Sequence, residues 1–244
     1  MQIQGITVLV TGANRGIGMG FVTALLERGA RRIYATARNP DSLDAVVARA
    51  PGQVIPIELD VTDQTEVSAA ARVASDVTLL INNGGIAAMT GFLAPPTLDG
   101  AREEMEVNFW GQLEMVRAFA PILKANGGGG IIQVLSIGAL FCAPSVGTYC
   151  ASKFAANAMC QGLRAELAPQ RTHVMGVFSG AIESDMSART PGPKISALTH
   201  GHHCLAAFED GFEEFYPDFK AQRMRDAYLQ DPTAFMRGLR PQNY

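Results

Sequence analysis

A glycine-rich turn separates the first apolar run of the chain from a stretch with helical periodicity. Residues 6–10 read Ile-Thr-Val-Leu-Val, and residues 11–18 then read Thr-Gly-Ala-Asn-Arg-Gly-Ile-Gly. Apolar residues recur at helical spacing from Ile17 to Leu26. A tight turn needs permissive backbone angles, and a pyrophosphate binds bare N–H groups at a helix N-terminus. The pattern therefore predicts a dinucleotide site made by Gly12, Asn14, Arg15, Gly16, Ile17 and Gly18.

The alternation of short apolar runs with helical patterns continues along most of the chain. After the first strand, we expect further strands at 32–36, 54–59, 77–81, 131–135, 172–178 and 214–216. We expect helices at 16–29, 41–50, 63–74, 99–125, 147–167 and 198–208, with Asp41 and Asp63 placed to cap two of them. Continuous apolar strands alternating with helices are typical of a parallel sheet covered on both faces. The predicted fold is α/β: a doubly wound parallel sheet (Rossmann fold) of about seven strands with helices on both faces, formed by residues 1–244 as one domain.

Composition narrows the classes of function. Hydrophobic residues make up 48% of the 244 residues and charged residues 18%, which suits a large core rather than a disordered chain. The net charge is −3 and the basic residues are dispersed, so no nucleic-acid partner is expected. Residues 1–5 lack the features of a secretory leader, and no apolar run approaches the ~18 residues of a membrane span. With no CxxC spacing among its four cysteines, the chain is expected to be cytoplasmic, with reduced thiols and no membrane partner.

Three histidines and a cysteine stand close together at His200, His202, His203 and Cys204. Neighbouring side chains on a helix point in different directions, so this group is a poor set of metal ligands. We expect no metal site, and a partly exposed helix start at these residues.

The end of the second strand favours one cofactor over another. Sites for NAD usually place a carboxylate after this strand to bind the ribose hydroxyls, but the sequence here is Thr36-Ala37-Arg38. Guanidinium groups match phosphate geometry, so Arg38, with Arg15 of the glycine turn, could bind a 2′-phosphate. The predicted cofactor is NADP.

Further motifs follow the glycine turn along the chain. Asp60-Val61 follows the third strand, and Asn82-Asn83-Gly84-Gly85 follows the fourth. Ser136 precedes Tyr149 by thirteen residues, and Tyr149 precedes Lys153 by four. With these motifs and its glycine turn, the chain resembles the short-chain dehydrogenase/reductase family in its single-domain form over residues 5–187. The resemblance implies catalytic roles for Asn108, Ser136, Tyr149 and Lys153. It also implies cofactor contacts from Asp60, Val61, Asn82, Gly84, Tyr149, Lys153, Gly180, Ile182 and Ser184.

Three positions depart from the family pattern. Gly84 stands where the family has Ala, Ser179-Gly180 where it usually has Pro-Gly, and Ser184 where it usually has Thr. Ser184 retains a hydroxyl for the nicotinamide carboxamide, so cofactor binding should survive. Loss of the proline is expected to loosen the strand exit and the loop beyond it.

The residue types suit proton transfer. Tyr149 and Lys153 share one face of a predicted helix, and a nearby ammonium is expected to lower the pKa of the phenol from its usual value near ~10. Such a tyrosine can donate a proton to a carbonyl oxygen as hydride arrives at the carbon, while Ser136 hydrogen-bonds the same oxygen. The resemblance further implies that Lys153 holds the nicotinamide ribose and that Asn108 binds a water of a proton relay.

The expected function is therefore NADP-dependent reduction of a ketone or aldehyde, or oxidation of the alcohol, with a small-molecule carbonyl or alcohol as substrate. The alternative is a non-catalytic dinucleotide-binding regulator, which would not need Ser136, Tyr149 and Lys153. A methyltransferase on a related sheet is disfavoured by the missing acid beside Arg38. Residues 184–210 are expected to form a substrate loop and lid. Apolar residues on several faces of helices 99–125 and 147–167, together with the resemblance, predict a homodimer or homotetramer.

Overall fold

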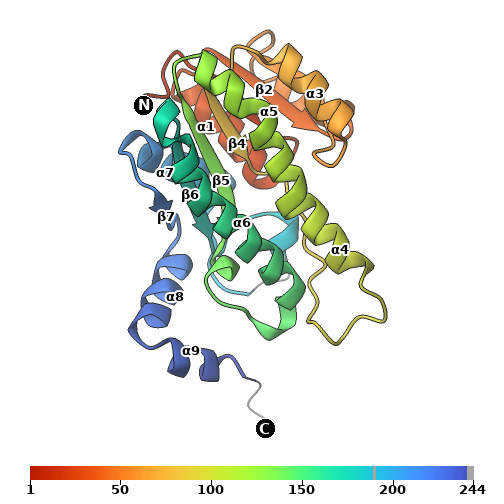
Figure 1. Ribbon diagram of the computed structural model, residues 1–244, viewed down its shortest axis with the longest axis vertical. Coiled ribbons are helices and arrows are strands. Elements are labelled where there is room, and N and C mark those ends of the chain that lie inside the picture. The colour runs from red at the N-terminus through yellow and green to blue at the C-terminus, as the bar shows by residue number, and fades with distance from the viewer. Residues whose placement is uncertain (189–190, 241–244) are drawn as a thin grey trace.

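Seven parallel strands form one sheet in the computed structural model, which describes residues 1–188 and 191–240 (Figure 1). The strands are β1 (Thr7–Val10), β2 (Arg32–Ala37), β3 (Val54–Glu58), β4 (Leu79–Asn82), β5 (Gly130–Ser136), β6 (His173–Ser179) and β7 (Glu214–Phe215). Their spatial order is β3-β2-β1-β4-β5-β6-β7, and every neighbouring pair is parallel. The predicted doubly wound sheet is confirmed. Two residues of the predicted lid, 189 and 190, and the C-terminal residues 241–244 lie outside the described part of the chain.

Helices cover both faces of this sheet (Figure 1). One face carries α1 (Gly16–Glu27), α2 (Asp44–Val47) and α7 (Ala197–Glu209). The other carries α3 (Gln64–Val73), α5 (Gln112–Ala125) and α6 (Gly147–Leu167). Short 3-10 helices complete the connections: η1 (Pro40–Leu43), η3 (Ile137–Ala139), η4 (Pro144–Val146), η5 (Ala168–Gln170) and η6 (Asp185–Ser187).

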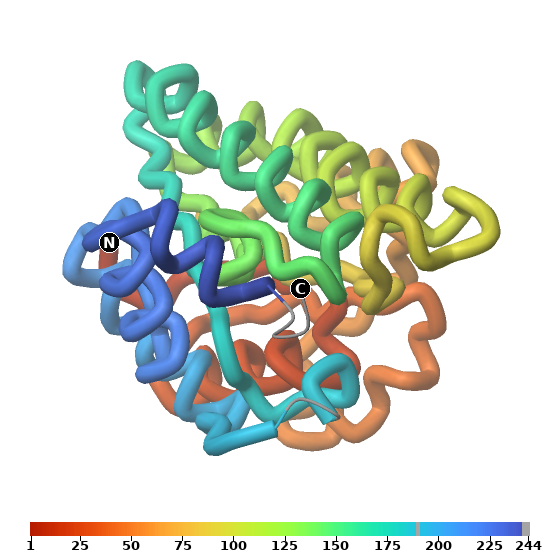
Figure 2. Tube along the Cα trace, turned by 90° about the horizontal axis from the view of Figure 1, so that it is seen from below, coloured from red at the N-terminus to blue at the C-terminus, as the bar shows by residue number. Residues whose placement is uncertain are grey.

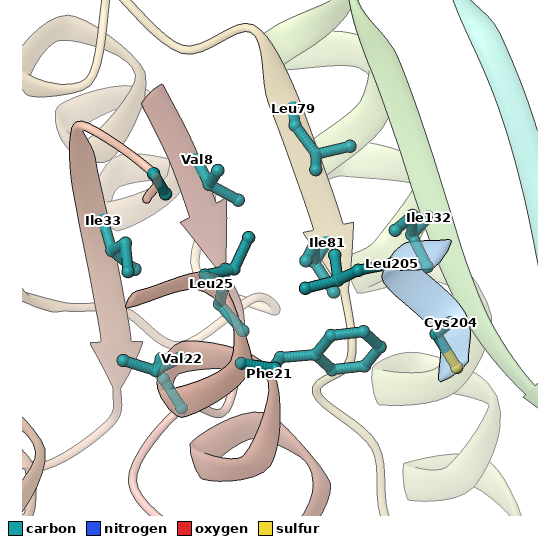
Figure 3. Close-up of a cluster of buried hydrophobic side chains, with 14 of the residues drawn as sticks. Val8, Phe21, Val22, Leu25, Ile33, Leu79, Ile81, Ile132, Cys204 and Leu205 are labelled. Carbon is teal, nitrogen blue, oxygen red and sulfur yellow. The ribbon is translucent and has the colours of Figure 1, made fainter. Parts of the chain in front are cut away.

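The core between the sheet and α1 fixes the element that follows the glycine turn. Val8, Ile33 and Ile81 project from three strands towards Phe21 of α1 and Leu205 of α7 (Figure 3). All five side chains are fully buried. Burying an aliphatic or aromatic side chain contributes about 1.5–3 kcal/mol. This packing holds the N-terminus of α1 at one end of the sheet.

The segment predicted as a helix over 41–50 is instead two short turns, η1 and α2. Asp41 is not the cap as predicted: Asn39 accepts the hydrogen bond from the Asp41 backbone N–H at 3.0 Å. Pro40 sits at the first helical position, so the turn begins before Asp41. The other predicted cap is confirmed, because Asp63 accepts two backbone N–H groups at the start of α3.

The helix predicted over 99–125 changes its winding in the middle. It comprises α4 (Asp99–Met105), a π-helical turn η2 (Glu106–Gly111) and α5. A π-turn widens the helix by one residue and is common near functional sites. Periodicity alone could not reveal it, because a single wide turn shifts the apolar face only slightly.

The C-terminal segment adds two helices, neither of which was predicted. These are α8 (Phe219–Gln230) and α9 (Pro232–Gly238). Only Ala221 of α8 is buried, so its apolar periodicity is weak. Figure 2 shows α9 beside the segment that follows β5, and the Phe235 ring packs on Phe141 with ring centroids 4.6 Å apart. The tail therefore covers the segment immediately after Ser136.

The close contact between α1 and α7 gives a stability prediction. A Cβ added at Gly20 would lie 2.2 Å from the Ala197 carbonyl oxygen. Gly20→Ala should therefore destabilise the protein by about 1–3 kcal/mol through overpacking, although helix propensity alone favours Ala by about 1 kcal/mol. Urea unfolding followed by circular dichroism measures the difference. Gly238→Ala is the control, since a Cβ there meets nothing within 4 Å. A Gly20→Ala protein as stable as the wild type would contradict this account.

Candidate active site

A cleft of about 450 Å³ opens where the strands β1, β4, β5 and β6 end. Carboxyl ends of parallel strands are where open α/β sheets place their ligand sites. Most of the predicted residues line this cleft: Gly12, Asn14, Arg15, Gly16, Ile17, Arg38, Asp60, Val61, Gly84, Ser136, Tyr149, Lys153, Gly180, Ile182 and Ser184. Three predicted residues, Gly18, Asn82 and Asn108, do not line it.

The glycine turn presents bare backbone to the cleft. Gly12 has a positive φ of 62°, and a Cβ there would lie 3.2 Å from Gly84 Cα. Gly18 lies behind the lining, where a Cβ would come within 2.1 Å of the Gly12 carbonyl oxygen. The turn can close only without side chains at these positions, and it leaves the N-terminus of α1 facing the cleft. These residues fit the pyrophosphate of a dinucleotide.

Asn83 binds the glycine turn to the exit of β4. Its side-chain amide donates to the carbonyl oxygens of Thr11 and Gly12 at 2.8 and 3.2 Å. In return, the Thr11 hydroxyl accepts from the backbone N–H groups of Asn83 and Gly84 at 2.9 and 2.8 Å. Asn83 lines the cleft, yet it was not among the predicted site residues. The two consecutive asparagines at 82–83 indicated a site here, but the sequence does not indicate which of the two lines the cleft.

Asn82 lies below the cleft as part of a buried polar network. Its amide donates to the Gln112 carbonyl oxygen at 3.1 Å and to Gln133 Oε1 at 3.2 Å. The Asn82 side chain is fully buried. The structure thus places Asn82 beneath the residues that line the cleft.

Asn108 is connected to Tyr149 through one intermediate side chain. The Asn108 amide donates to Ser152 Oγ at 2.9 Å, and Ser152 Oγ donates to the Tyr149 carbonyl oxygen at 2.8 Å. The same amide group also binds the backbone of Ile86. Asn108 therefore lies behind Tyr149 as seen from the cleft, and it holds the turn of α6 that carries Tyr149.

The end of the cleft beyond β2 is lined by Arg38, Asn39 and Ser42, none of which is acidic. Asn39 and Ser42 were not predicted as site residues. Arg15 reaches across the mouth of the cleft, with Nη1 2.9 Å from Asp185 Oδ2. Both side chains of this pair are largely exposed (72% and 75%). An exposed ion pair contributes little free energy, so Arg15 remains available to another anion.

Ser136, Tyr149 and Lys153 converge on one part of the cleft. Lys153 is buried, its Nζ donates to the Val134 carbonyl oxygen at 3.0 Å, and it lies 5.8 Å from the centroid of the Tyr149 ring. Ser136 Oγ accepts from the Gly138 backbone N–H at 3.1 Å. The last residue of β5 and one face of α6 thus supply a hydroxyl, a phenol and an ammonium to the same cavity.

The predicted lowering of the Tyr149 pKa by Lys153 is wrong for the protein alone. Burial raises the pKa of Tyr149 to about 12, and a hydrogen bond with Ser136 offsets this only in part. Burial likewise lowers the pKa of Lys153 to about 8. Desolvation disfavours the charged form of each group. The ammonium also points to a backbone carbonyl rather than to the phenol.

The exit of β6 is held by side chains from the C-terminal third of the chain. Ser179, which stands at the proline position of the family pattern, hydrogen-bonds His200 Nε2 at 2.9 Å. Asp218 accepts the backbone N–H groups of Gly180 and Ala181 at 2.8 and 3.2 Å. These bonds oppose the loosening expected from the missing proline. Neither His200 nor Asp218 was predicted to act here, because both lie far from Ser179 in sequence.

The histidines near residue 200 have separate partners. His200 is buried, not partly exposed as expected, and burial lowers its pKa to about 3. His202 binds Glu27 and His203 binds the Pro217 carbonyl oxygen. Within residues 1–188 and 191–240, no three His, Cys, Asp or Glu side chains gather where they could hold a metal ion. Over the same residues, no helix has both the length and the apolarity to cross a bilayer.

Comparison with known proteins agrees with this geometry. The family model for short chain dehydrogenases matches residues 6–193. Estradiol 17-beta-dehydrogenase 1 of Rattus norvegicus is 30% identical over 221 residues, covering 85% of this chain and 64% of the rat protein. The chain therefore spans less than two thirds of that relative. Short-chain dehydrogenase PC-15 of Penicillium crustosum is 34% identical over 225 residues, covering 89% of this chain and 79% of that protein.

A solved structure is similar over nearly the whole chain. The short chain dehydrogenase of Burkholderia cenocepacia J2315, in complex with NADP, is 45% identical with a TM-score of 0.93. The alignment covers 99% of this chain and 100% of that one. The family match, the sheet order and the cleft agree: this chain belongs to the short-chain dehydrogenase/reductase family.

Proposed function

We propose that this protein is an NADP-dependent oxidoreductase that reduces a ketone or aldehyde, or oxidises the corresponding alcohol, with Tyr149 as acid and base. The observation that carries the proposal is the shared cleft, in which Ser136, Tyr149 and Lys153 stand beside the glycine turn. A regulator that only bound a dinucleotide would need the turn but not these three groups. The similarity to a protein named estradiol 17-beta-dehydrogenase 1 supports an alcohol and ketone pair as substrates.

The preference for NADP rests on the cleft wall beyond β2. Arg38, Asn39 and Ser42 line it and offer a cation and polar groups without a carboxylate. Arg15 lies at the mouth of the same cleft. A 2′-phosphate would receive charge-assisted hydrogen bonds from these guanidinium groups. The similar Burkholderia cenocepacia structure holds NADP, which supports this choice.

When bound, NADP supplies or accepts the hydride. The phenol of Tyr149, whose pKa is about 12, is protonated at neutral pH and can donate its proton to the carbonyl oxygen. Ser136 would hydrogen-bond the same oxygen and stabilise its developing charge. The Lys153 ammonium would stabilise the phenolate that remains, and the chain from Asn108 through Ser152 would keep Tyr149 in place. We also propose that Asn108 contributes to the return of the proton and that Lys153 contacts the nicotinamide ribose.

Two further parts of the proposal concern the surroundings of the site. Met186 lines the cleft and is 45% exposed, which supports a lid role for the segment after β6. The predicted lid 184–210 includes α7, which packs on α1, so the described residues before Ala197 are the ones that could move. We also propose that the protein associates as a homodimer or homotetramer, which the exposed side chains of Trp110 on η2 and Phe154 on α6 support.

Removing the phenolic hydroxyl tests the catalytic assignment. Tyr149→Phe should lower NADPH-dependent turnover by about 10²–10⁴-fold, because the proton donor is lost, while NADPH binding stays within about twofold. NADPH consumption is measured against a panel of ketones, aldehydes, quinones and imines, and binding by NADPH fluorescence. Tyr228→Phe, on α8 outside the cleft lining, is the control. Tight NADPH binding by the wild type without consumption on any carbonyl would favour the regulator instead.

Cofactor choice can be tested at Arg38. Arg38→Ser should raise the KM for NADPH about 10- to 100-fold, the loss expected for one charge-assisted hydrogen bond, and should leave the KM for NADH nearly unchanged. Arg72→Ser, an exposed arginine of α3, is the matched control. Equal effects on the two cofactors would show that Arg38 does not contact the 2′-phosphate.

The pH dependence of reduction follows from the two shifted groups. Tyr149, with a pKa of about 12, stays protonated at the pH values where activity is measured. Lys153, with a pKa of about 8, is charged below that pH and loses its proton above it. The kcat/KM for the carbonyl substrate should therefore be level below about pH 7 and fall as pH rises through about 8. A profile that stays level to about pH 10 would mean that the charge of Lys153 is not needed.

A further inference from the structure

Glu104 is a buried acid to which the proposed function gives no role. It lies in α4 and its side chain is fully buried. Its Oε1 accepts a hydrogen bond from the Ala88 backbone N–H at 2.6 Å. Its Oε2 has no hydrogen-bond partner within the described residues. A buried carboxylate loses its hydration, so its presence costs free energy and calls for a physical reason.

Glu104 and Asn108 hold the same segment of chain. Asn108 lies one helical turn further along and binds both the N–H and the carbonyl oxygen of Ile86, each at 2.9 Å. Two residues later, the N–H of Ala88 is bound by Glu104. The helix thus fixes the segment Ile86–Met89 at two points.

Ile86 of this segment lines the same cleft as Tyr149 and Lys153. Three residues of the segment line a second cavity of about 400 Å³, which adjoins the cofactor cleft through Gly85 and Ile86. Met89 has a φ of 56°, a left-handed conformation that costs free energy for a residue with a side chain. The hydrogen bond from the preceding residue to Glu104 restrains the chain at this strained position.

The charge of Glu104 also acts on Tyr149. Burial is the largest cause that raises the pKa of Tyr149, and a hydrogen bond with Ser136 lowers it. The charge of Glu104 raises it further. Glu104 therefore favours the protonated phenol, which is the form needed to reduce a carbonyl.

We propose that Glu104 is a positioning residue that fixes Ile86–Met89 as the substrate-side wall of the cleft, and that its charge favours the protonated form of Tyr149. The inference rests on the proposed function, because it assigns the second cavity to the carbonyl substrate. Loss of Glu104 should then weaken substrate binding more than cofactor binding.

Two substitutions separate the hydrogen bond from the charge. Glu104→Gln keeps an oxygen that can accept from Ala88 N–H and removes the charge, whereas Glu104→Leu removes both. Glu103→Gln and Glu106→Gln are the controls, since both are exposed neighbours and lose the same charge. The readouts are the KM for the carbonyl substrate, the NADPH dissociation constant, the pH profile of alcohol oxidation, and hydrogen exchange of the peptide that contains residues 86–89.

Glu104→Leu should raise the KM for the carbonyl substrate about tenfold, as expected for a lost hydrogen bond to a charged group. It should leave NADPH binding within about twofold and speed exchange at residues 86–89. Glu104→Gln should keep the KM and the slow exchange. Because it removes a charge that disfavours the phenolate, it should move the rise of alcohol oxidation to lower pH. Neither control should change any readout.

A folded Glu104→Leu protein with unchanged KM and exchange would overturn the proposal, as would a Glu104→Gln profile identical to that of Glu103→Gln. If Glu104→Leu does not fold, the Glu104→Gln profile decides. If the wild-type protein reduces no carbonyl, the proposed function fails. The exchange at residues 86–89 then still tests whether Glu104 restrains this wall.

Discussion

The exits of β1 and β4 are bound to each other by Asn83 and Thr11, and the rest of the site is arranged around this contact. The order of strands runs outward in opposite directions from β1 and β4, so a crevice must open between the connections that leave them. Four hydrogen bonds of 2.8–3.2 Å close the floor of that crevice. They also leave no room for side chains at Gly12 and Gly18. The bare helix N-terminus faces the cleft because these two strands are joined so tightly.

Burial sets the electrostatics on the other side of the cleft. Tyr149 and Lys153 are both shifted towards their neutral forms, the phenol to a pKa of about 12 and the ammonium to about 8. In the protein alone, Tyr149 is thus protonated and can act as a proton donor, but it is not ready to act as a base. Lys153 does not lower the pKa of Tyr149 in the protein alone, because its Nζ donates to the Val134 carbonyl oxygen and not to the phenol. In the proposed reaction, the Lys153 ammonium would stabilise the phenolate that remains after the proton is transferred.

One departure from the family pattern has a partner elsewhere in the chain. Ser179 replaces a proline, and its hydroxyl meets His200 of α7. Asp218 both caps α8 and accepts two backbone N–H groups at the exit of β6. The C-terminal helices, with Phe235 packed on Phe141, cover the segment after Ser136. The loop beyond β6 therefore starts from an anchored strand end, and any movement of a lid begins after that point.

The sequence by itself determined the parallel sheet and most of the residues that line the cleft, because both depend on local patterns. Short stretches of sequence are enough to recognise the apolar runs of strand length, the glycine turn and the spacing of Ser136, Tyr149 and Lys153. Tertiary structure decided the choice between Asn82 and Asn83, the place of Asn108 behind Tyr149, and the bonds from His200 and Asp218 to the end of β6. It also decided the direction of the Tyr149 pKa shift. Each of these depends on burial or on contacts between distant segments, and a helical spacing of four residues specifies neither.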